Sequence, residues 1–189
     1  MPTEKIIIIT APSGSGKSTL TKRLMAEFPE LAFSISACTR SPRAGEIDGQ
    51  DYHFISVKQF QDYIAANEFI EWEMVYEGKY YGTLKNEINR IWNQSKIPLV
   101  DIDVKGALNV QEQYREKAKS IFIQAPSIET LKKRLENRGT ETPESLAERI
   151  DKAAYELSFA PLFDHIIVND DLESATTTLI QIIAEYLKN

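Results

Sequence analysis

The chain has 189 residues, of which 42% are hydrophobic and 26% charged, a composition typical of one globular domain and not of a disordered segment. Its 22 Lys and Arg against 28 Asp and Glu give a net charge of −6, so we expect neither nucleic acid nor a membrane surface as a partner. The single cysteine, Cys38, excludes an internal disulfide and a multi-cysteine zinc site.

Predicted strands and helices alternate along most of the chain. The β-branched run at 6–9 predicts a strand buried on both faces, and helical spacing of Leu20, Leu24 and Phe28 predicts a helix at 19–28. Further buried strands are predicted at 97–102, 119–124 and 165–168. Helices are predicted at 105–116, 127–138, 143–157 and 172–187, the third introduced by Thr142-Pro143. The alternation indicates the α/β class, with a parallel sheet core flanked by helices.

The stretch from 33 to 95 departs from this rhythm. Short strands are predicted at 33–36 and 52–55, with turn residues between them, and a short helix near 60–65. We interpret the stretch as a small α+β subdomain inserted into a single domain, 1–189. The core then comprises about 1–32, 96–126 and 159–189, the insertion about 33–95, and a mobile helical lid about 127–158.

The strongest chemical signal is the run Ala-Pro-Ser-Gly-Ser-Gly-Lys-Ser, which matches GxxxxGK[ST] except that Ala11 replaces the first glycine. Gly14 and Gly16 let backbone N–H groups turn toward a polyphosphate, and the following helix adds its positive dipole end. Lys17 offers charge to the β and γ phosphate oxygens, and Ser18 offers a hydroxyl to Mg²⁺. The predicted nucleoside triphosphate site comprises Ala11, Pro12, Ser13, Gly14, Ser15, Gly16, Lys17, Ser18 and Thr19.

Two carboxylates close the strand predicted at 97–102. Asp101 and Asp103 are expected on the same face because side chains alternate along a strand, and either one could serve Mg²⁺, directly or through water. The chain has no guanine motif of the NKxD type, which argues against a switch GTPase.

A second set of residues suits a monophosphate. Arg40 and Arg43 lie three apart in a Pro/Gly-rich loop, and guanidinium groups bind phosphate in a bidentate manner. Tyr52 and Tyr81 offer phenolic donors to the same oxygens.

Seven spaced motifs, together with the phosphate loop, give the chain a resemblance to the guanylate kinase family over nearly its whole length. They are Ser36-x-x-Thr39-Arg40-x-x-Arg43, Asp51-Tyr52-x-Phe54, Phe69-Ile70-Glu71-Trp72, Tyr80-Tyr81-Gly82-Thr83, Asp101-Ile102-Asp103, Arg138-Gly139-Thr140-Glu141 and Ile167-Val168-Asn169-Asp170-Asp171. The resemblance implies ATP-dependent phosphorylation of GMP to GDP with Mg²⁺, as part of purine nucleotide metabolism. It implies ATP and GMP as the small-molecule partners. The oligomeric state stays open, a homo-oligomer being one of the possibilities. A cytoplasmic location is expected because the sequence shows no signal peptide and no paired cysteines.

The resemblance also implies roles for single residues. Ser36, Glu71, Thr83 and Asp103 would bind the guanine, the insertion thus being the GMP-binding part. Arg40, Arg43, Tyr52 and Tyr81 would hold the GMP phosphate. Lys17, Arg40 and the lid arginines Arg134, Arg138 and Arg149 would be catalytic, and Asn169 would lie near the ATP adenine.

The residue types also suit guanine chemically. Guanine presents N1–H and N2–H₂ donors and an O6 acceptor, which match the carboxylates of Glu71 and Asp103 and the hydroxyls of Ser36 and Thr83. Adenine would leave those carboxylates facing an acceptor nitrogen.

Two alternatives remain open: a kinase for another small monophosphate, and a guanylate-kinase-like binding module of the kind found in scaffold proteins.

Overall fold

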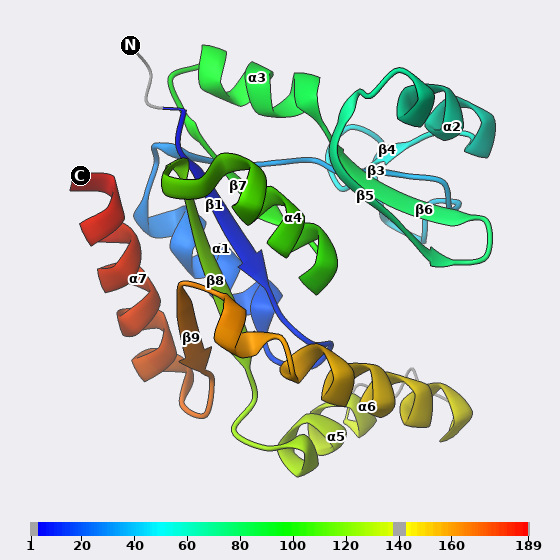
Figure 1. The fold of residues 1–189 in the computed structure, drawn as a ribbon. Coiled ribbons are helices and arrows are strands. Elements are labelled where there is room, and N and C mark those ends of the chain that lie inside the picture. The colour runs from blue at the N-terminus through cyan, green and yellow to red at the C-terminus, as the bar shows by residue number, and fades with distance from the viewer. Residues whose placement is uncertain (1–3, 138–142, 189) are drawn as a thin grey trace. The chain divides into compact units, whose positions relative to one another are not determined.

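The computed structural model describes residues 4–137 and 143–188 (Figure 1). In chain order its elements are β1 Ile6–Thr10, α1 Lys17–Glu27, β2 Leu31–Phe33, β3 Ala37–Cys38, β4 His53–Phe54, α2 Val57–Ala65, β5 Phe69–Tyr76, β6 Lys79–Leu84, α3 Lys85–Asn93, β7 Ile97–Asp101, α4 Val104–Tyr114, η1 Arg115–Lys117, β8 Ala118–Gln124, α5 Ile128–Glu136, α6 Pro143–Leu157, η2 Ala160–Leu162, β9 His165–Val168 and α7 Leu172–Lys188.

The larger sheet has the strand order β2-β7-β1-β8-β9, in which β2 runs parallel to β7 and β8 parallel to β9. All five residues of β1 are buried, as its Ile-Ile-Ile-Ile-Thr sequence requires. The prediction of an α/β fold with a parallel sheet and flanking helices is confirmed. Over the described residues, no helix is long and apolar enough to cross a membrane.

The chain divides into two compact units. Unit 1 contains Met1–Ile7 and Glu30–Ala118, and unit 2 contains Ile8–Pro29 and Lys119–Asn189, so that β1 contributes to both. The predicted division into core, insertion and lid stays a prediction.

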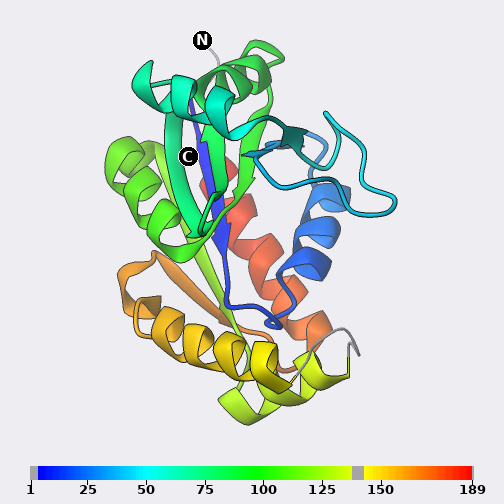
Figure 2. The same ribbon diagram turned by 90° about the vertical axis from the view of Figure 1, so that its right-hand side faces the viewer.

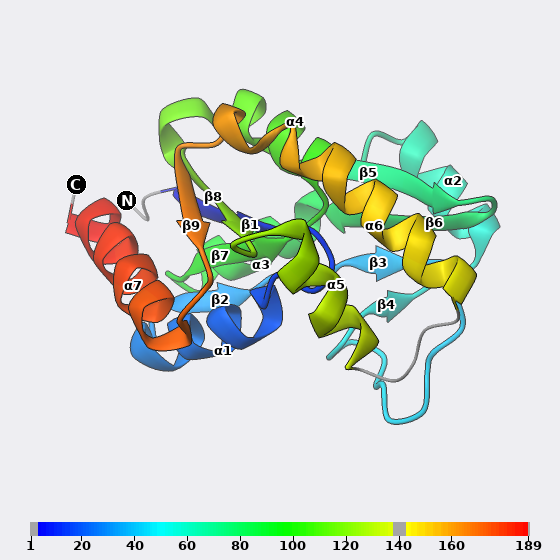
Figure 3. The ribbon, with the colours of Figure 1, turned by 90° about the horizontal axis from the view of Figure 1, so that it is seen from below.

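Unit 2 holds two pairs of packed helices. Helix α7 lies along α1 (Figure 1), where Arg23 forms an ion pair of 2.7 Å with Glu173 and donates a hydrogen bond to Thr176. Helix α5 lies along α6 (Figure 3), and the buried side chains of Leu131, Leu135 and Ala153 form their shared core. The predicted helix at 127–138 is confirmed as α5, with Ser127 capping it by accepting from the Thr130 N–H at 3.1 Å.

Unit 1 contains a second sheet, of order β4-β3-β6-β5. The antiparallel hairpin β5–β6 forms one side of this sheet, with β5 at its edge, and sets Glu71 opposite Thr83. Helix α2 covers this sheet through Phe60, whose ring stacks on that of Phe69 with centroids 4.4 Å apart. Between β3 and β4 the chain forms a long loop, drawn in cyan in Figure 2.

The strand predicted at 33–36 is wrong, because the chain there passes from one sheet to the other. Residues 31–33 pair with β7, and residues 37–38 join the second sheet as β3. Between them, the Ile35 N–H donates to the Glu87 carboxylate at 3.1 Å instead of to a strand neighbour. The other short strand, predicted at 52–55, is β4, and the predicted short helix is α2. Sequence analysis did not identify β5, β6 or α3. The expected Thr142 cap lies outside the described residues.

Candidate nucleotide and acceptor sites

The phosphate loop joins β1 to α1 in unit 2. Gly14 and Gly16 both have φ of +90°, a conformation that glycine adopts without strain. Gly16 is also the N-cap of α1, and because it has no side chain, no side-chain oxygen caps the first N–H groups of the helix. Lys17 and Ser18 form the first turn of α1, with Ser18 exposed. The loop therefore presents backbone donors, a helix N-terminus and a cation together, the arrangement suited to a polyphosphate.

Two side chains lie close against the phosphate loop. A Cβ on Gly16 would lie 2.2 Å from Asn169 Nδ2, and one on Gly14 would lie 3.2 Å from the Leu135 side chain. Asn169 is 5% exposed, and its amide donates to the Ser15 carbonyl oxygen at 2.8 Å. Asn169 thus contacts the loop backbone directly, which resemblance alone did not suggest; its predicted place near adenine stays a prediction.

Two of the arginines predicted for the lid lie at the phosphate loop or at Asn169, which contacts it. Arg134 Nη2 donates to the Asn169 carbonyl oxygen at 2.9 Å, and Arg149 Nη1 donates to Ser13 Oγ at 2.9 Å. The structure therefore brings Arg134 of α5 and Arg149 of α6 to one place. Arg138 lies outside the described residues.

The residues expected to serve Mg²⁺ have different surroundings. Asp101 ends β7, whereas Asp103 has left the strand and is the N-cap of α4, where its Oδ1 accepts from the Lys105 and Gly106 N–H groups. The expected common strand face for the two aspartates is therefore wrong. Over the described residues, no three acidic, His or Cys side chains cluster as metal ligands. The exposed Ser18 hydroxyl beside a polyphosphate cradle fits a cation that arrives with its nucleotide.

Glu71 is the centre of the predicted base-binding group in unit 1. Its side chain is buried, at 6% exposure, and its Oε1 accepts from the Thr83 hydroxyl at 2.7 Å. Burial, the largest effect, and the charge of Asp103 together raise the pKa of Glu71 to about 7, against the opposing effect of the Thr83 hydrogen bonds. The carboxylate reaches the first turn of α4, where a Cβ on Gly106 would lie 2.6 Å from Glu71 Oε2. Glu71, Thr83 and Asp103 are thus brought together.

Ser36 lies between β2 and β3, half-buried, and its carbonyl oxygen accepts from the His53 N–H at 2.9 Å. The segment that carries it is fastened by Glu87 of α3, a buried carboxylate that also holds Arg90 through two hydrogen bonds. Burial would raise the pKa of Glu87, but the hydrogen bonds from Arg90 and Ile35 outweigh it and lower the pKa. Sequence reasoning missed Glu87; its only signal was a glutamate on the buried face of α3, three residues before an arginine.

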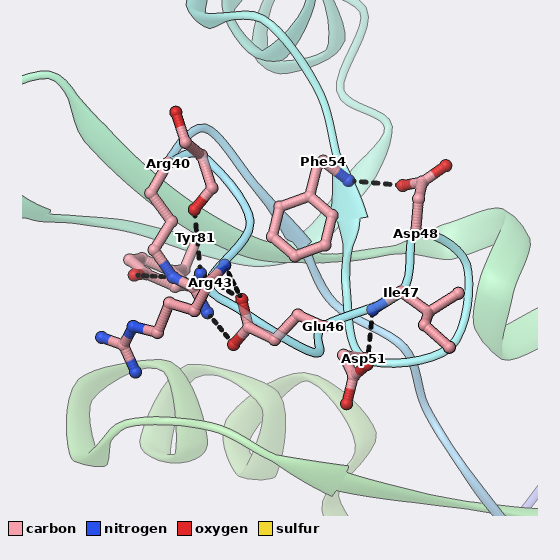
Figure 4. A network of polar contacts seen from close by, with 9 residues as sticks. Arg40, Arg43, Glu46, Ile47, Asp48, Asp51, Phe54 and Tyr81 are labelled. Carbon is pink, nitrogen blue, oxygen red and sulfur yellow. Dashed lines mark hydrogen bonds and ion pairs between the residues drawn. The ribbon is translucent and has the colours of Figure 1, made fainter.

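The predicted monophosphate group comprises Arg40, Arg43 and Tyr52 in the loop after β3 and Tyr81 on β6, and Figure 4 shows the two arginines with Tyr81. Arg40 Nε donates to the Tyr81 hydroxyl oxygen at 3.1 Å, and its Cζ lies 5.0 Å from the centroid of the Tyr52 ring. Burial raises the pKa of the Tyr52 phenol, so it remains a donor at neutral pH. Arg40, Tyr52 and Tyr81 therefore come together, while the exposed Arg43 guanidinium points away from Arg40 in Figure 4.

Sequence reasoning missed Glu46, which binds Arg40. Its carboxylate oxygens accept from Nη1 and Nη2 of Arg40 at 2.6 and 2.7 Å. The turn at Gly45, whose φ is +88°, precedes Glu46 in this loop. In the sequence, the only sign of this role was an acidic residue directly after a glycine of the kind that forms turns.

Comparison with known proteins agrees with this geometry. The family model described as Guanylate kinase matches residues 3–186. A guanylate kinase from Bacteroides fragilis is 49% identical over 183 residues, covering 97% of this chain and 90% of that protein. One from Salinibacter ruber is 42% identical over 189 residues, covering 100% of both. The crystal structure of guanylate kinase from Anaplasma phagocytophilum superimposes with a TM-score of 0.76 at 30% identity, covering 96% of this chain and 86% of that one.

Proposed function

The chain belongs to the guanylate kinase family, and from this premise we propose that it transfers the γ-phosphoryl group of ATP to GMP, yielding ADP and GDP. The observation that carries the choice of acceptor is the buried Glu71 carboxylate opposite Thr83. A buried carboxylate is costly unless a ligand supplies donors, and the N1–H and N2–H₂ groups of guanine are such donors.

Rejection of adenine follows from the same pair. Once Glu71 is ionised, adenine would place an acceptor nitrogen against its carboxylate, leaving two acceptors facing each other. Sites built on buried hydrogen bonds discriminate against such a mismatch by factors of up to about 10⁴. Glu71 and Thr83 are therefore proposed to select the base, with Ser36 and Asp103 as further contacts.

The nucleophile needs no activation by a covalent intermediate, because GMP provides its own phosphate oxygen. That oxygen attacks the γ-phosphorus as the bond to the ADP oxygen breaks, so the protein contributes position and charge neutralisation. Lys17, Arg134 and Arg149 would neutralise the transferring group from unit 2. Mg²⁺, held by the Ser18 hydroxyl and phosphate oxygens, would supply further neutralising charge when bound. Whether Asp101 or Asp103 serves it through water stays a prediction, as does a catalytic role for Arg138.

On this proposal the small-molecule partners are ATP and GMP, and the reaction returns GMP to the diphosphate pool in purine nucleotide metabolism. The cytoplasmic location expected from the sequence stays a prediction.

The decisive experiment is an ADP-release assay with ATP, Mg²⁺ and one of four acceptors: GMP, AMP, CMP or UMP. We expect ADP release with GMP and little with the other three. A preference for AMP would contradict the role given to Glu71. If no acceptor yields ADP while GMP still binds by calorimetry, the chain is a binding module and not an enzyme.

A further inference from the structure

Glu46 is fastened to both arginines of the predicted monophosphate group. Beyond its two hydrogen bonds from Arg40, Glu46 Oε2 accepts from the backbone N–H of Arg43 at 2.7 Å (Figure 4). The Arg40 and Glu46 side chains are only 10% and 19% exposed, so the pair is largely shielded from water. These hydrogen bonds lower the pKa of Glu46 to about 2, and it is therefore a carboxylate at every pH of interest.

The hydrogen bonds of Arg40 show what remains for a ligand. A guanidinium has five N–H donors. The Nε hydrogen goes to Tyr81, the Nη1 hydrogens to Glu46 and the Ser41 carbonyl, and one Nη2 hydrogen to Glu46. One Nη2 hydrogen remains. The Tyr81 hydroxyl accepts from Arg40, and its own hydrogen is then directed elsewhere.

Two aromatic rings also lie beside the same guanidinium. The Cζ of Arg40 lies 5.0 Å from the Tyr52 ring centroid and 5.5 Å from that of Phe54. Because Glu46 and Tyr81 accept its hydrogen bonds and two rings lie beside it, Arg40 has little rotational freedom. Ordering a free arginine side chain costs conformational entropy, and that cost is already met here before a ligand binds.

We propose that Glu46 is a positioning residue for the acceptor phosphate, one that orients Arg40 and the Arg43 backbone while staying in place when the phosphate binds. The phosphate then meets the remaining Nη2 hydrogen of Arg40 and the Tyr81 hydroxyl, and the exposed Arg43 guanidinium, which points away from Arg40 in Figure 4, turns toward it. This inference rests on the proposed function, because it takes the phosphate to be that of GMP.

The rest of the loop is held independently of Glu46. Asp51 accepts from the Ile47 N–H at 2.8 Å, and Asp48 accepts from the Phe54 N–H at 2.8 Å (Figure 4). Replacing Glu46 should therefore disturb Arg40 without unfolding the loop.

The opposite role makes the opposite prediction. If Glu46 merely occupied the arginine fork until a phosphate displaced it, removing its charge would strengthen phosphate binding. Glu46→Gln distinguishes the two roles, since it keeps the side-chain shape but turns one acceptor into a donor that faces an N–H group.

The experiment measures steady-state kinetics and calorimetric affinity for GMP and for guanosine, which lacks the phosphate. For Glu46→Gln we expect KM and Kd for GMP to rise about tenfold or more, from loss of charge-assisted hydrogen bonds, with kcat changed less than about threefold. Guanosine affinity and the KM for ATP should match wild type. Glu46→Asp, which retains the charge, should recover part of the GMP affinity. Glu173→Gln is the matched control, because it also breaks an Arg–Glu ion pair of 2.7 Å, but in unit 2.

Each other outcome overturns the inference. Unchanged or tighter GMP binding by Glu46→Gln would show that Glu46 does not position the arginines. Equal loss of GMP and guanosine affinity in Glu46→Gln would show a general defect of the loop. If Glu46→Gln fails to fold, equal loss of both affinities in Glu46→Asp would show that defect instead. A wild-type chain that neither binds nor phosphorylates GMP would instead overturn the proposed function, and this inference with it.

Discussion

Replacing Glu71 by glutamine should stabilise the protein at neutral pH while damaging GMP recognition. The side chain is 6% exposed, and burial raises its pKa from the ordinary 4.5 to about 7. A carboxyl with a raised pKa holds its proton more tightly when folded. Its contribution to stability is therefore greatest below pH 4.5 and is lost as the pH rises to about 7. Glutamine has the same shape but no charge to desolvate.

The magnitude follows from the pKa difference. At 1.36 kcal/mol per pH unit, the full cost of the buried carboxylate above pH 7 is about 3 kcal/mol, and most of it is acquired between pH 5 and pH 8. The free energy of unfolding of Glu71→Gln minus that of wild type should therefore be larger at pH 8 than at pH 5, by about 2 to 3 kcal/mol. Taking a difference between two pH values cancels any constant effect of the amide on the Thr83 hydrogen bond.

The assay is urea denaturation of both ligand-free proteins at the two pH values, with Glu173→Gln, whose side chain is 76% exposed in wild type, as a control that should show a flat difference. A Glu71→Gln difference that is the same at pH 5 and pH 8 would refute the argument from burial. By calorimetry, the variant should lose GMP affinity and keep ATP affinity. Equal weakening of both nucleotides would remove Glu71 from base recognition.

Three further predictions concern the two sites. Lys17→Ala should lower kcat by about 10³-fold with the unfolding free energy changed by less than about 1 kcal/mol, because Lys17 serves phosphates and not the core; comparable turnover would contradict its role. The affinity of the wild-type protein for GMP should rise as the pH increases from 6 to 8, because the donors of guanine bind the Glu71 carboxylate and not its protonated form. Calorimetry should show a smaller rise for Glu71→Gln, in which only the phosphate of GMP still titrates. Gly106→Ala should raise the KM for GMP about tenfold and leave the KM for ATP unchanged, because the added Cβ would lie 2.6 Å from Glu71 Oε2. Equal effects on the two KM values would argue for general misfolding of α4.

Features written in contiguous residues could be predicted from the sequence. The apolar run that forms β1, the glycine pattern of the phosphate loop and the spacing of Leu131 and Leu135 in α5 each depend on neighbours within one or two turns of chain. The α/β class followed from their alternation.

Contacts between residues far apart in the sequence could not be predicted in this way. That the Asn169 amide binds the Ser15 carbonyl, 154 positions away, depends on where β9 ends relative to the phosphate loop within unit 2. Similarly, Glu87 fastens Ile35 only because α3 packs beside the passage between two sheets. A polar residue in sequence gives no sign of which partner satisfies it, because solvent can satisfy it equally well.

The sequence by itself therefore determined the chemistry that this protein offers: a phosphate loop with Lys17 and Ser18, paired arginines, and carboxylates suited to guanine. Only the tertiary structure decided the state of those groups. It buries Glu71 against α4 so that its carboxyl titrates near pH 7, and it binds Arg40 to Glu46. The physical reason is that residue type sets which hydrogen bonds a side chain can make, whereas burial and long-range packing set which of them it makes and at what cost in charge.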